Sequence, residues 1–170
     1  MTRPSTKIMI MDACVLIDFL KTDRSVLSLF VKHIGPVHVI SPVVEEVKNI
    51  DNADELIELG LFIVEPELDD AFEAVTRKGP TSFQDNLCLL TAKRNGFTCV
   101  TNDKNLREYC LQEGVPILWG LQLLSILHKQ GGISRAGVLD IAEQIHKSNP
   151  KHITPSILKR FSDMVNSSDA

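Results

Sequence analysis

Short apolar runs and amphipathic stretches alternate along the first two thirds of the chain. The short runs, several of them rich in β-branched side chains, are typical of buried strands and occupy residues 7–11, 37–40, 61–64, 97–100 and 115–118. Between them, apolar residues recur with a helical period, as at Leu68, Ala71, Phe72 and Val75. This period predicts helices over residues 23–34, 41–50, 54–59, 68–75, 82–95 and 104–113.

Turn residues separate these elements. Gly35-Pro36 and Gly79-Pro80 each end a helix, and Ser41-Pro42 begins one, with proline at a position where its missing N–H needs no partner. Strands that alternate with helices indicate βαβ crossovers and therefore parallel pairing. We expect a three-layer α/β/α sandwich with a mainly parallel sheet of about five strands, whose last strand lies at an edge because it contains Pro116.

The last third of the chain has the pattern of helices only. Apolar residues with a helical period form three pieces, separated by Gly131-Gly132 and Asn149-Pro150, over residues 121–128, 138–145 and 157–165. We predict that residues 1–130 form the α/β domain and that residues 131–170 form a helical C-terminal extension packed on or beside it.

Composition narrows the class of protein but names no activity. The 170 residues are 44% hydrophobic and 24% charged, which excludes a disordered or collagen-like chain. With 18 Lys and Arg against 22 Asp and Glu, the formal net charge of −4 argues weakly against a protein that coats polyanions. We see no signal-peptide pattern and no apolar stretch of the roughly 18–20 residues that span a bilayer, so we expect a cytoplasmic protein that does not bind membranes.

Acidic residues follow the predicted strands at the places where a parallel sheet gathers side chains. Asp12 ends the first strand, and Asp103 follows the end of the fourth. Glu46 and Asp85 lie near the starts of the helices that begin at residues 41 and 82. Because parallel strands end, and their return helices begin, at the same edge of the sheet, we expect these four carboxylates to lie together.

Such a cluster of carboxylates predicts a bound cation. Each pair of carboxylates 4 Å apart repels by about 4 kcal/mol at an effective dielectric constant near 20. No Lys or Arg stands immediately beside Asp12, Glu46 or Asp85 in the sequence. Oxygen ligands suit hard ions, so we expect Mg²⁺ or Mn²⁺, which activates water and neutralises the charge of a phosphodiester.

Each acid also has a purely structural interpretation. Ser82 and Asp85 have the spacing of a helix capping box, and Asp103 has the position of a helix N-cap. Glu45 and Glu46 are both compatible with a solvated helix face, and we prefer Glu46 as the site residue because it borders the core-facing stripe. The coincidence of four acids at one edge, and not any single acid, carries the hypothesis of a site.

Polar neighbours of these acids are candidates for positioning them or a substrate. Thr101 and Asn102 precede Asp103, Lys104 follows it, and Ser82 precedes Asp85. Their structural interpretation is turn and capping chemistry. Cations that we consider for phosphate binding are Lys21, Arg77, Lys78, Lys93, Arg94, Lys104 and Arg107. A single Trp and a single Tyr leave few platforms on which bases could stack.

Together, these segments resemble the PIN domain family. The resemblance spans about residues 7–119 and rests on four motifs in order, Ile10-Met-Asp12-Ala-Cys-Val-Leu-Ile-Asp18, Ile40-Ser-Pro-Val-Val-Glu-Glu46-Val, Ser82-Phe-Gln-Asp85 and Val100-Thr-Asn-Asp103-Lys-Asn-Leu106. It implies a Mg²⁺- or Mn²⁺-dependent endoribonuclease whose catalytic and metal-binding residues are Asp12, Glu46, Asp85 and Asp103. Thr101 matches the hydroxyl residue that usually precedes the last acid by two places.

The resemblance also implies partners. Many similar prokaryotic members are toxins of toxin–antitoxin pairs, in which a small antitoxin protein inserts a segment into the acidic site, and such members commonly form homodimers. The helical tail here is longer than that of a minimal toxin domain, which weakens the implied toxin role more than the fold or the metal site. The alternative is a catalytically silent PIN-like module that binds RNA or a protein; its mark is loss of an acid, and all four are present.

Overall fold

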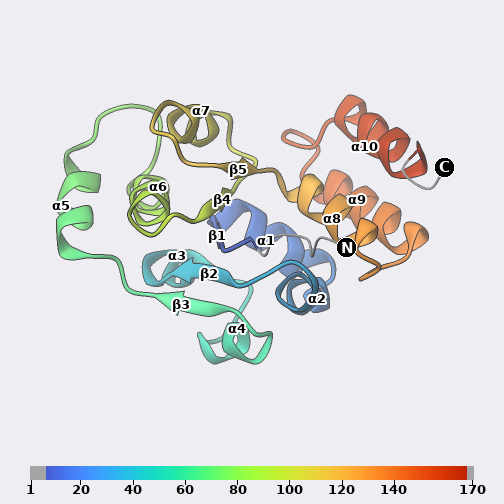
Figure 1. Cartoon of the computed structure of the whole chain (residues 1–170), viewed down its shortest axis with the longest axis horizontal. Helices are drawn as coiled ribbons and strands as arrows, with labels where there is room; N and C mark the ends of the chain where they lie inside the picture. The colour runs from blue at the N-terminus through green and yellow to red at the C-terminus, as the bar shows by residue number, and fades with distance from the viewer. Residues whose placement is uncertain (1–6, 168–170) are drawn as a thin grey trace, which may run out of the picture.

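A five-stranded parallel sheet forms the centre of the molecule (Figure 1). The structure is a computed structural model that describes residues 7–167. In the order β3-β2-β1-β4-β5, each strand pairs in parallel with its neighbours. The strand bounds are β1 (Met9–Met11), β2 (Val37–Ile40), β3 (Phe62–Val64), β4 (Thr98–Val100) and β5 (Ile117–Leu118). The predicted α/β class and the edge position of β5 are confirmed.

Helices cover both faces of this sheet. α6 (Phe83–Asn95) and α7 (Lys104–Gln112) lie on one face, and α1 (Ala13–Thr22) and α2 (Ser25–His33) lie on the other (Figure 1). Right-handed connections explain this division, because the chain steps from β1 to β2 in one direction and from β4 to β5 in the opposite one. The remaining connections contain α3 (Ser41–Glu46), α4 (Asp54–Glu58) and α5 (Leu68–Thr76).

β1 is the central strand and is buried on both faces. Met9, Ile10 and Met11 are all 0% exposed, which is why this strand reads as a continuous apolar run and not as an alternating one. Met11 pairs with Val100 at the end of β4, and the backbone N–H of Asp12 donates to the Val100 carbonyl over 3.1 Å. This register brings the carboxyl ends of β1 and β4 level with each other.

The C-terminal helices form an outer layer beyond α1 and α2 (Figure 1). Their bounds are α8 (Gly120–Lys129), α9 (Arg135–Ser148) and α10 (Pro155–Ser167). α9 packs against α1, and its residues Val138, Ile141 and Ile145 belong to the same apolar core as the sheet. At the end of α9, the Asn149 side-chain amide donates to Asp18 on α1 over 3.4 Å. The division of the chain near residue 130 stays a prediction.

α1 is the helix that the apolar pattern did not predict. The apolar pattern predicts the first helix at residues 23–34 and none before it, and this expectation is wrong, because α1 occupies Ala13–Thr22. α9 and α3 pack against α1, and Leu16, Asp18 and Phe19 are all buried, so that no polar face marks a helical period. Among residues 7–167, neither α1 nor any other helix is long and apolar enough to cross a membrane.

α5 was predicted correctly as a helix, but its apolar stripe does not face the core. Leu68, Phe72 and Val75 are 70%, 66% and 71% exposed. The face turned toward α6 instead carries Asp70 and Ala74, which are buried. A helical period therefore indicated the element here without indicating which of its faces packs against the protein.

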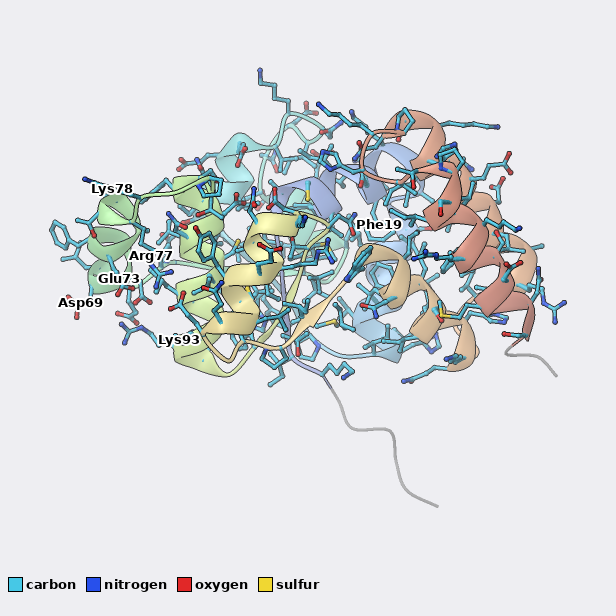
Figure 2. All side chains as sticks on the ribbon, turned by 90° about the horizontal axis from the view of Figure 1, so that it is seen from above. Phe19, Asp69, Glu73, Arg77, Lys78 and Lys93 are labelled. Carbon is cyan, nitrogen blue, oxygen red and sulfur yellow. The ribbon has the colours of Figure 1, made fainter. Side chains whose placement is uncertain are left out.

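Ion pairs join α5, α6 and α7 on one side of the molecule (Figure 2). Arg77 and Lys93 both contact the Glu113 carboxylate, over 2.6 Å and 3.3 Å. Arg94 binds Asp70 over 2.8 Å. Three of the cations that we considered for phosphate binding are thus engaged in holding helices together.

Phe30 provides a direct test of the core. It is 0% exposed and its ring packs edge-on against Phe19, with 5.0 Å between ring centroids. We expect Phe30→Ala to lower the free energy of unfolding by about 3–5 kcal/mol, because it removes a large buried ring and leaves a cavity. Urea denaturation measures this change. The matched control is Phe72→Ala on the exposed face of α5, which should change stability by less than about 0.5 kcal/mol.

Candidate active site

Asp12 is buried where β1 ends and α1 begins. Its side chain is 2% exposed, and one carboxylate oxygen accepts hydrogen bonds from the Val15 backbone N–H (3.2 Å) and the Cys14 thiol (3.1 Å). The bond from Val15 makes Asp12 the N-cap of α1. The other oxygen accepts a hydrogen bond from the Thr101 hydroxyl. Asp12 is therefore held on both oxygens by residues of two different segments.

Thr101 connects two of the predicted acids. It is fully buried at the end of β4, where its hydroxyl donates to Asp12 and accepts a hydrogen bond from the Asp103 backbone N–H over 3.0 Å. Asn102 is bound in a different direction, because its side-chain oxygen accepts from the backbone N–H of Gly120 over 3.0 Å. Thr101 thus orients the acids, and Asn102 fastens the end of β4 to the start of α8.

Asp85 and Ser82 form the capping box that their spacing predicts. The Ser82 hydroxyl accepts from the Asp85 backbone N–H over 3.1 Å, and the Ser82 backbone N–H donates to one Asp85 oxygen over 3.2 Å. The other Asp85 oxygen has no hydrogen-bond partner among the described residues and is not buried. Capping therefore orients Asp85 and leaves one of its oxygens free for a ligand.

Asp103 is the N-cap of α7, as its position predicts. One carboxylate oxygen accepts from the Leu106 backbone N–H over 2.9 Å. The other oxygen, like that of Asp85, has no hydrogen-bond partner in the described part of the chain and is open to solvent. Lys104 follows as the first residue of α7 and is exposed.

Electrostatic coupling shows that three of the acids lie near one another. Burial is the main cause that raises the pKa of Asp12 from 3.8 to about 6, and the negative charge of Asp85 adds to it. Burial likewise raises the pKa of Asp85, and the charge of Asp103 adds to that rise. Hydrogen bonds from Thr101 and Ser82 act in the opposite direction on Asp12 and Asp85, respectively. The site favours protonation or a cation.

No hydrogen bond or ion pair among residues 7–167 links Glu46 to this group. α3 ends at Glu46 and does not extend to residue 50 as predicted, so Glu46 is in the last turn of a six-residue helix. Its side chain is exposed and makes no hydrogen bond or ion pair with residues 7–167, and the same is true of Glu45. The structure brings together Asp12, Asp85 and Asp103, but it does not join Glu46 to them.

The donor chemistry of this group fits a hard divalent cation. Carboxylate oxygens and a threonine hydroxyl are the atoms present, and Mg²⁺ is commonly held by only one or two carboxylates while it keeps several waters. Within residues 7–167, no three His, Cys, Asp or Glu side chains are arranged to form a complete metal site. An ion here would use the free oxygens of Asp85 and Asp103 together with water molecules.

Arg107 and Trp119 adjoin this edge and were not paired by sequence reasoning. The Arg107 guanidinium lies 3.8 Å from the centre of the Trp119 ring. Arg107 is one helical turn after Asp103, and Trp119 directly follows β5. The sequence places Arg107 four residues after Asp103 and Trp119 directly after the predicted fifth strand, which was the signal that both side chains lie near this edge.

Comparison with known proteins identifies the fold. The structure resembles that of a PilT N-terminus domain protein from the hyperthermophilic archaeon Sulfolobus solfataricus, with a TM-score of 0.50 and 12% sequence identity, over 71% of this chain and 92% of that chain. No protein-family model matches the chain, and neither does any curated protein. The fold is therefore PIN-like.

Asp12→Asn tests whether the buried negative charge of Asp12 lowers the stability of the folded protein. Because the folded pKa of about 6 lies above the usual 3.8, the neutral acid is favoured in the folded state, and wild-type stability falls as pH rises through 6. Asparagine carries no charge, so between pH 4 and pH 8 the stability difference should shift toward the variant by about 2–3 kcal/mol. Urea denaturation in EDTA at both pH values measures it.

Asp140→Asn is the control for this experiment. Asp140 lies on α9, is exposed and, among residues 7–167, has a hydrogen bond only with Gln144 on the same helix. Its substitution should leave the stability difference from wild type nearly constant between the two pH values. Equal pH dependence for the Asp12 and Asp140 variants would show that Asp12 is not a buried charge in the folded protein.

Proposed function

We propose that this protein is a metal-dependent endoribonuclease whose active centre contains Asp12, Asp85 and Asp103. The observation that carries the proposal is the meeting of these three acids at the carboxyl edge of a PIN-like sheet, where the charge of Asp85 raises the pKa of Asp12 and the charge of Asp103 raises the pKa of Asp85. Ligands of open α/β sheets bind at this edge. Capping accounts for some of the carboxylate oxygens of these acids, but it does not account for the free oxygens of Asp85 and Asp103 at the same edge.

The chain's own residues would bind the metal and move a proton. Asp85 and Asp103 each present one free carboxylate oxygen, which either holds the ion or accepts the proton that the attacking water releases. Buried Asp12, fixed by Thr101 and the start of α1, contributes negative charge beneath them. Mg²⁺ or Mn²⁺ bound there supplies Lewis-acid stabilisation of the phosphodiester and lowers the pKa of a water.

Hydrolysis in this arrangement breaks the bond between phosphorus and the 3′ oxygen. Water attacks the phosphorus in line with that oxygen, loses a proton to a carboxylate, and leaves a 5′ phosphate and a 3′ hydroxyl after the leaving oxygen is protonated. Glu46 is proposed to act through water molecules, because its exposed side chain is not bonded to the other acids. The toxin role, the antitoxin partner and the homodimer stay predictions of the resemblance.

Cleavage of single-stranded RNA in the presence of Mn²⁺ is the direct test of activity. We expect wild-type protein to cut the RNA and EDTA to stop it. Asp85→Asn should lower the rate about a hundredfold or more, because it removes charge at the point where the reaction develops it. Rates are measured on a labelled oligoribonucleotide separated by gel electrophoresis.

Neighbouring residues provide the controls for cleavage. Asp140→Asn should cut RNA as the wild type does. Glu46→Gln should lower the rate by about 10–100-fold, as is typical of groups that act on a metal through an intermediate, whereas Glu45→Gln should have little effect. RNA binding without cleavage by wild-type protein, in any divalent ion, would contradict the nuclease proposal and favour the silent RNA-binding alternative.

Metal binding is tested separately from catalysis. Mn²⁺ at about 100 times its dissociation constant should stabilise the folded protein by about 2.7 kcal/mol, which raises the thermal midpoint by about 5–10 °C for a chain of this size. The rise should disappear in Asp85→Asn and persist in Asp140→Asn. A rise of equal size in the Asp85 variant would place the bound ion elsewhere.

A further inference from the structure

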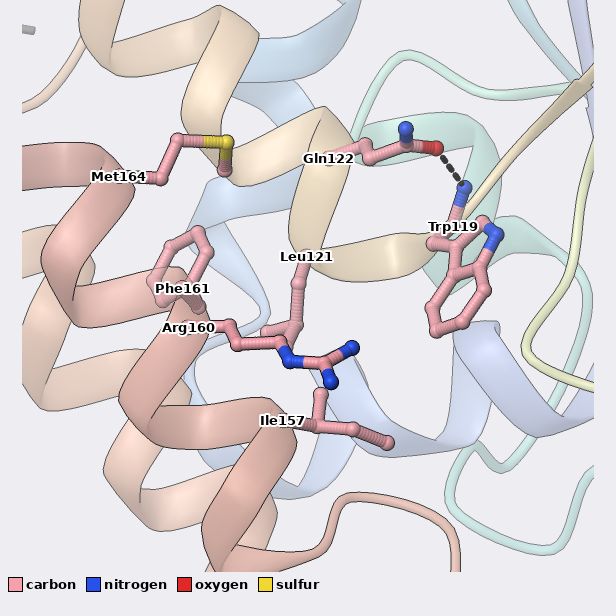
Figure 3. A pocket seen from close by; sticks show the side chains of 7 residues that line it. All are labelled: Trp119, Leu121, Gln122, Ile157, Arg160, Phe161 and Met164. Atoms are coloured by element: carbon pink, nitrogen blue, oxygen red, sulfur yellow. Dashed lines mark hydrogen bonds between the residues drawn. The ribbon is translucent and has the colours of Figure 1, made fainter.

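An apolar groove lies between the start of α8 and the side of α10 (Figure 3). Trp119 and Leu121 line it from one side, and Ile157, Phe161 and Met164 line it from α10. Its cavity volume is about 260 Å³. This is just below the roughly 300–1,000 Å³ of pockets that hold whole small-molecule ligands, so the groove suits one part of a larger ligand.

One end of the groove adjoins the candidate active site. Trp119 directly follows β5, and the backbone N–H of the next residue, Gly120, donates to the Asn102 side chain. Asn102 stands between Thr101 and Asp103. The end of β4, which carries Thr101 and Asp103, is thus bonded directly to the segment that carries Trp119.

The groove contains an aromatic ring backed by a cation. The Arg107 guanidinium lies 3.8 Å from the centre of the Trp119 ring, which holds the indole in place. The Arg107 Nε atom is buried and has no hydrogen-bond partner in the described part of the chain. Arg107 does not itself line the groove, so its contribution there is to hold the Trp119 ring in place.

A second cation reaches over the groove from the opposite side. Figure 3 shows the Arg160 guanidinium extending from α10 toward Trp119. Arg160 is exposed and makes no ion pair or hydrogen bond with residues 7–167. It is thus available for an anion, in contrast to Arg77, Lys93 and Arg94, which are paired.

We propose that this groove binds a nucleobase of single-stranded RNA next to the phosphate at the acidic site, with Trp119 stacking on the base and Arg160 contacting a flanking phosphate. The inference rests on the proposed nuclease function. A base combines a flat apolar face with polar edges and is tethered to negative charge, which matches an apolar groove lined by the aromatic rings of Trp119 and Phe161 and by one unpaired arginine, Arg160. Stacking accepts any base, so the groove would bind without reading sequence.

Trp119 is itself the probe, because it is the single tryptophan of the chain. The full-length protein is titrated in EDTA at low salt with a 12-nucleotide oligouridylate, while tryptophan fluorescence is recorded. We expect saturable quenching without cleavage. Absence of quenching while a labelled oligouridylate binds would overturn the proposal, since the base would then lie elsewhere.

Variants separate stacking from charge, with binding measured by fluorescence anisotropy of the labelled oligouridylate. Trp119→Ala should weaken binding by about tenfold or more, and Trp119→Phe should restore part of the loss.

Arg160→Ala should lower the slope of log affinity against log salt by about 0.7, the value for one phosphate contact on a single strand. Lys159→Ala, the neighbouring exposed cation on α10, tests whether any positive charge suffices, and it should retain higher affinity than Arg160→Ala. Equal affinity and equal salt slope for Arg160→Ala and Lys159→Ala would overturn the phosphate contact.

The outcome is distinguishable from failure of the nuclease proposal. Binding that depends on Trp119 and Arg160 in a protein that cuts no RNA would support the groove and contradict the nuclease. Cleavage that is unchanged in Trp119→Ala at limiting RNA would support the nuclease and contradict the groove. A helical peptide that quenches Trp119 where oligouridylate does not would assign the groove to a protein partner and overturn the inference.

Discussion

The parallel pairing of β1 with β4 is the constraint on which the candidate site depends. Because Met11 lies opposite Val100, the residues that follow these strands, Asp12 and Thr101, emerge level with each other. The Thr101 hydroxyl can then join Asp12 to the backbone of Asp103. A slip of one residue would turn Thr101 to the other face of the sheet and separate the acids.

Helix capping and the clustering of charge use the same side chains. Asp12 and Asp103 are N-caps, and Asp85 belongs to a capping box, so the positive ends of three helices meet at one edge. Their N–H groups stabilise negative charge, while burial and repulsion oppose it. The structural and functional interpretations of these acids are therefore compatible: capping uses some of the oxygens, and the remaining oxygens are free for a ligand.

Sequence reasoning predicted the elements best where burial was simple. The order of strands and helices followed from apolar runs and turn residues, and topology alone brought Asp12, Asp85 and Asp103 to one edge. It missed α1, because a helix covered on two sides has no polar face, and it did not show that Leu68 and Phe72 face solvent. Local patterns report an element's type, whereas its orientation depends on which neighbours reach it across the fold.

The helical tail, α8 to α10, affects which charged side chains are free near the acidic edge. Its helices cover α1, and Asn149 binds the buried carboxylate of Asp18, so this acid is part of the packing and is turned to the tail. Of the cations considered for phosphate binding, Arg77, Lys93 and Arg94 are paired with acids, whereas Lys104 is exposed next to Asp103. Arg160 on α10 is free of ion pairs within the described residues and extends toward the groove beside the acids. Attraction for a phosphate backbone at this edge therefore depends on Lys104, on Arg160 of the tail and on any bound metal, since the acids themselves repel it.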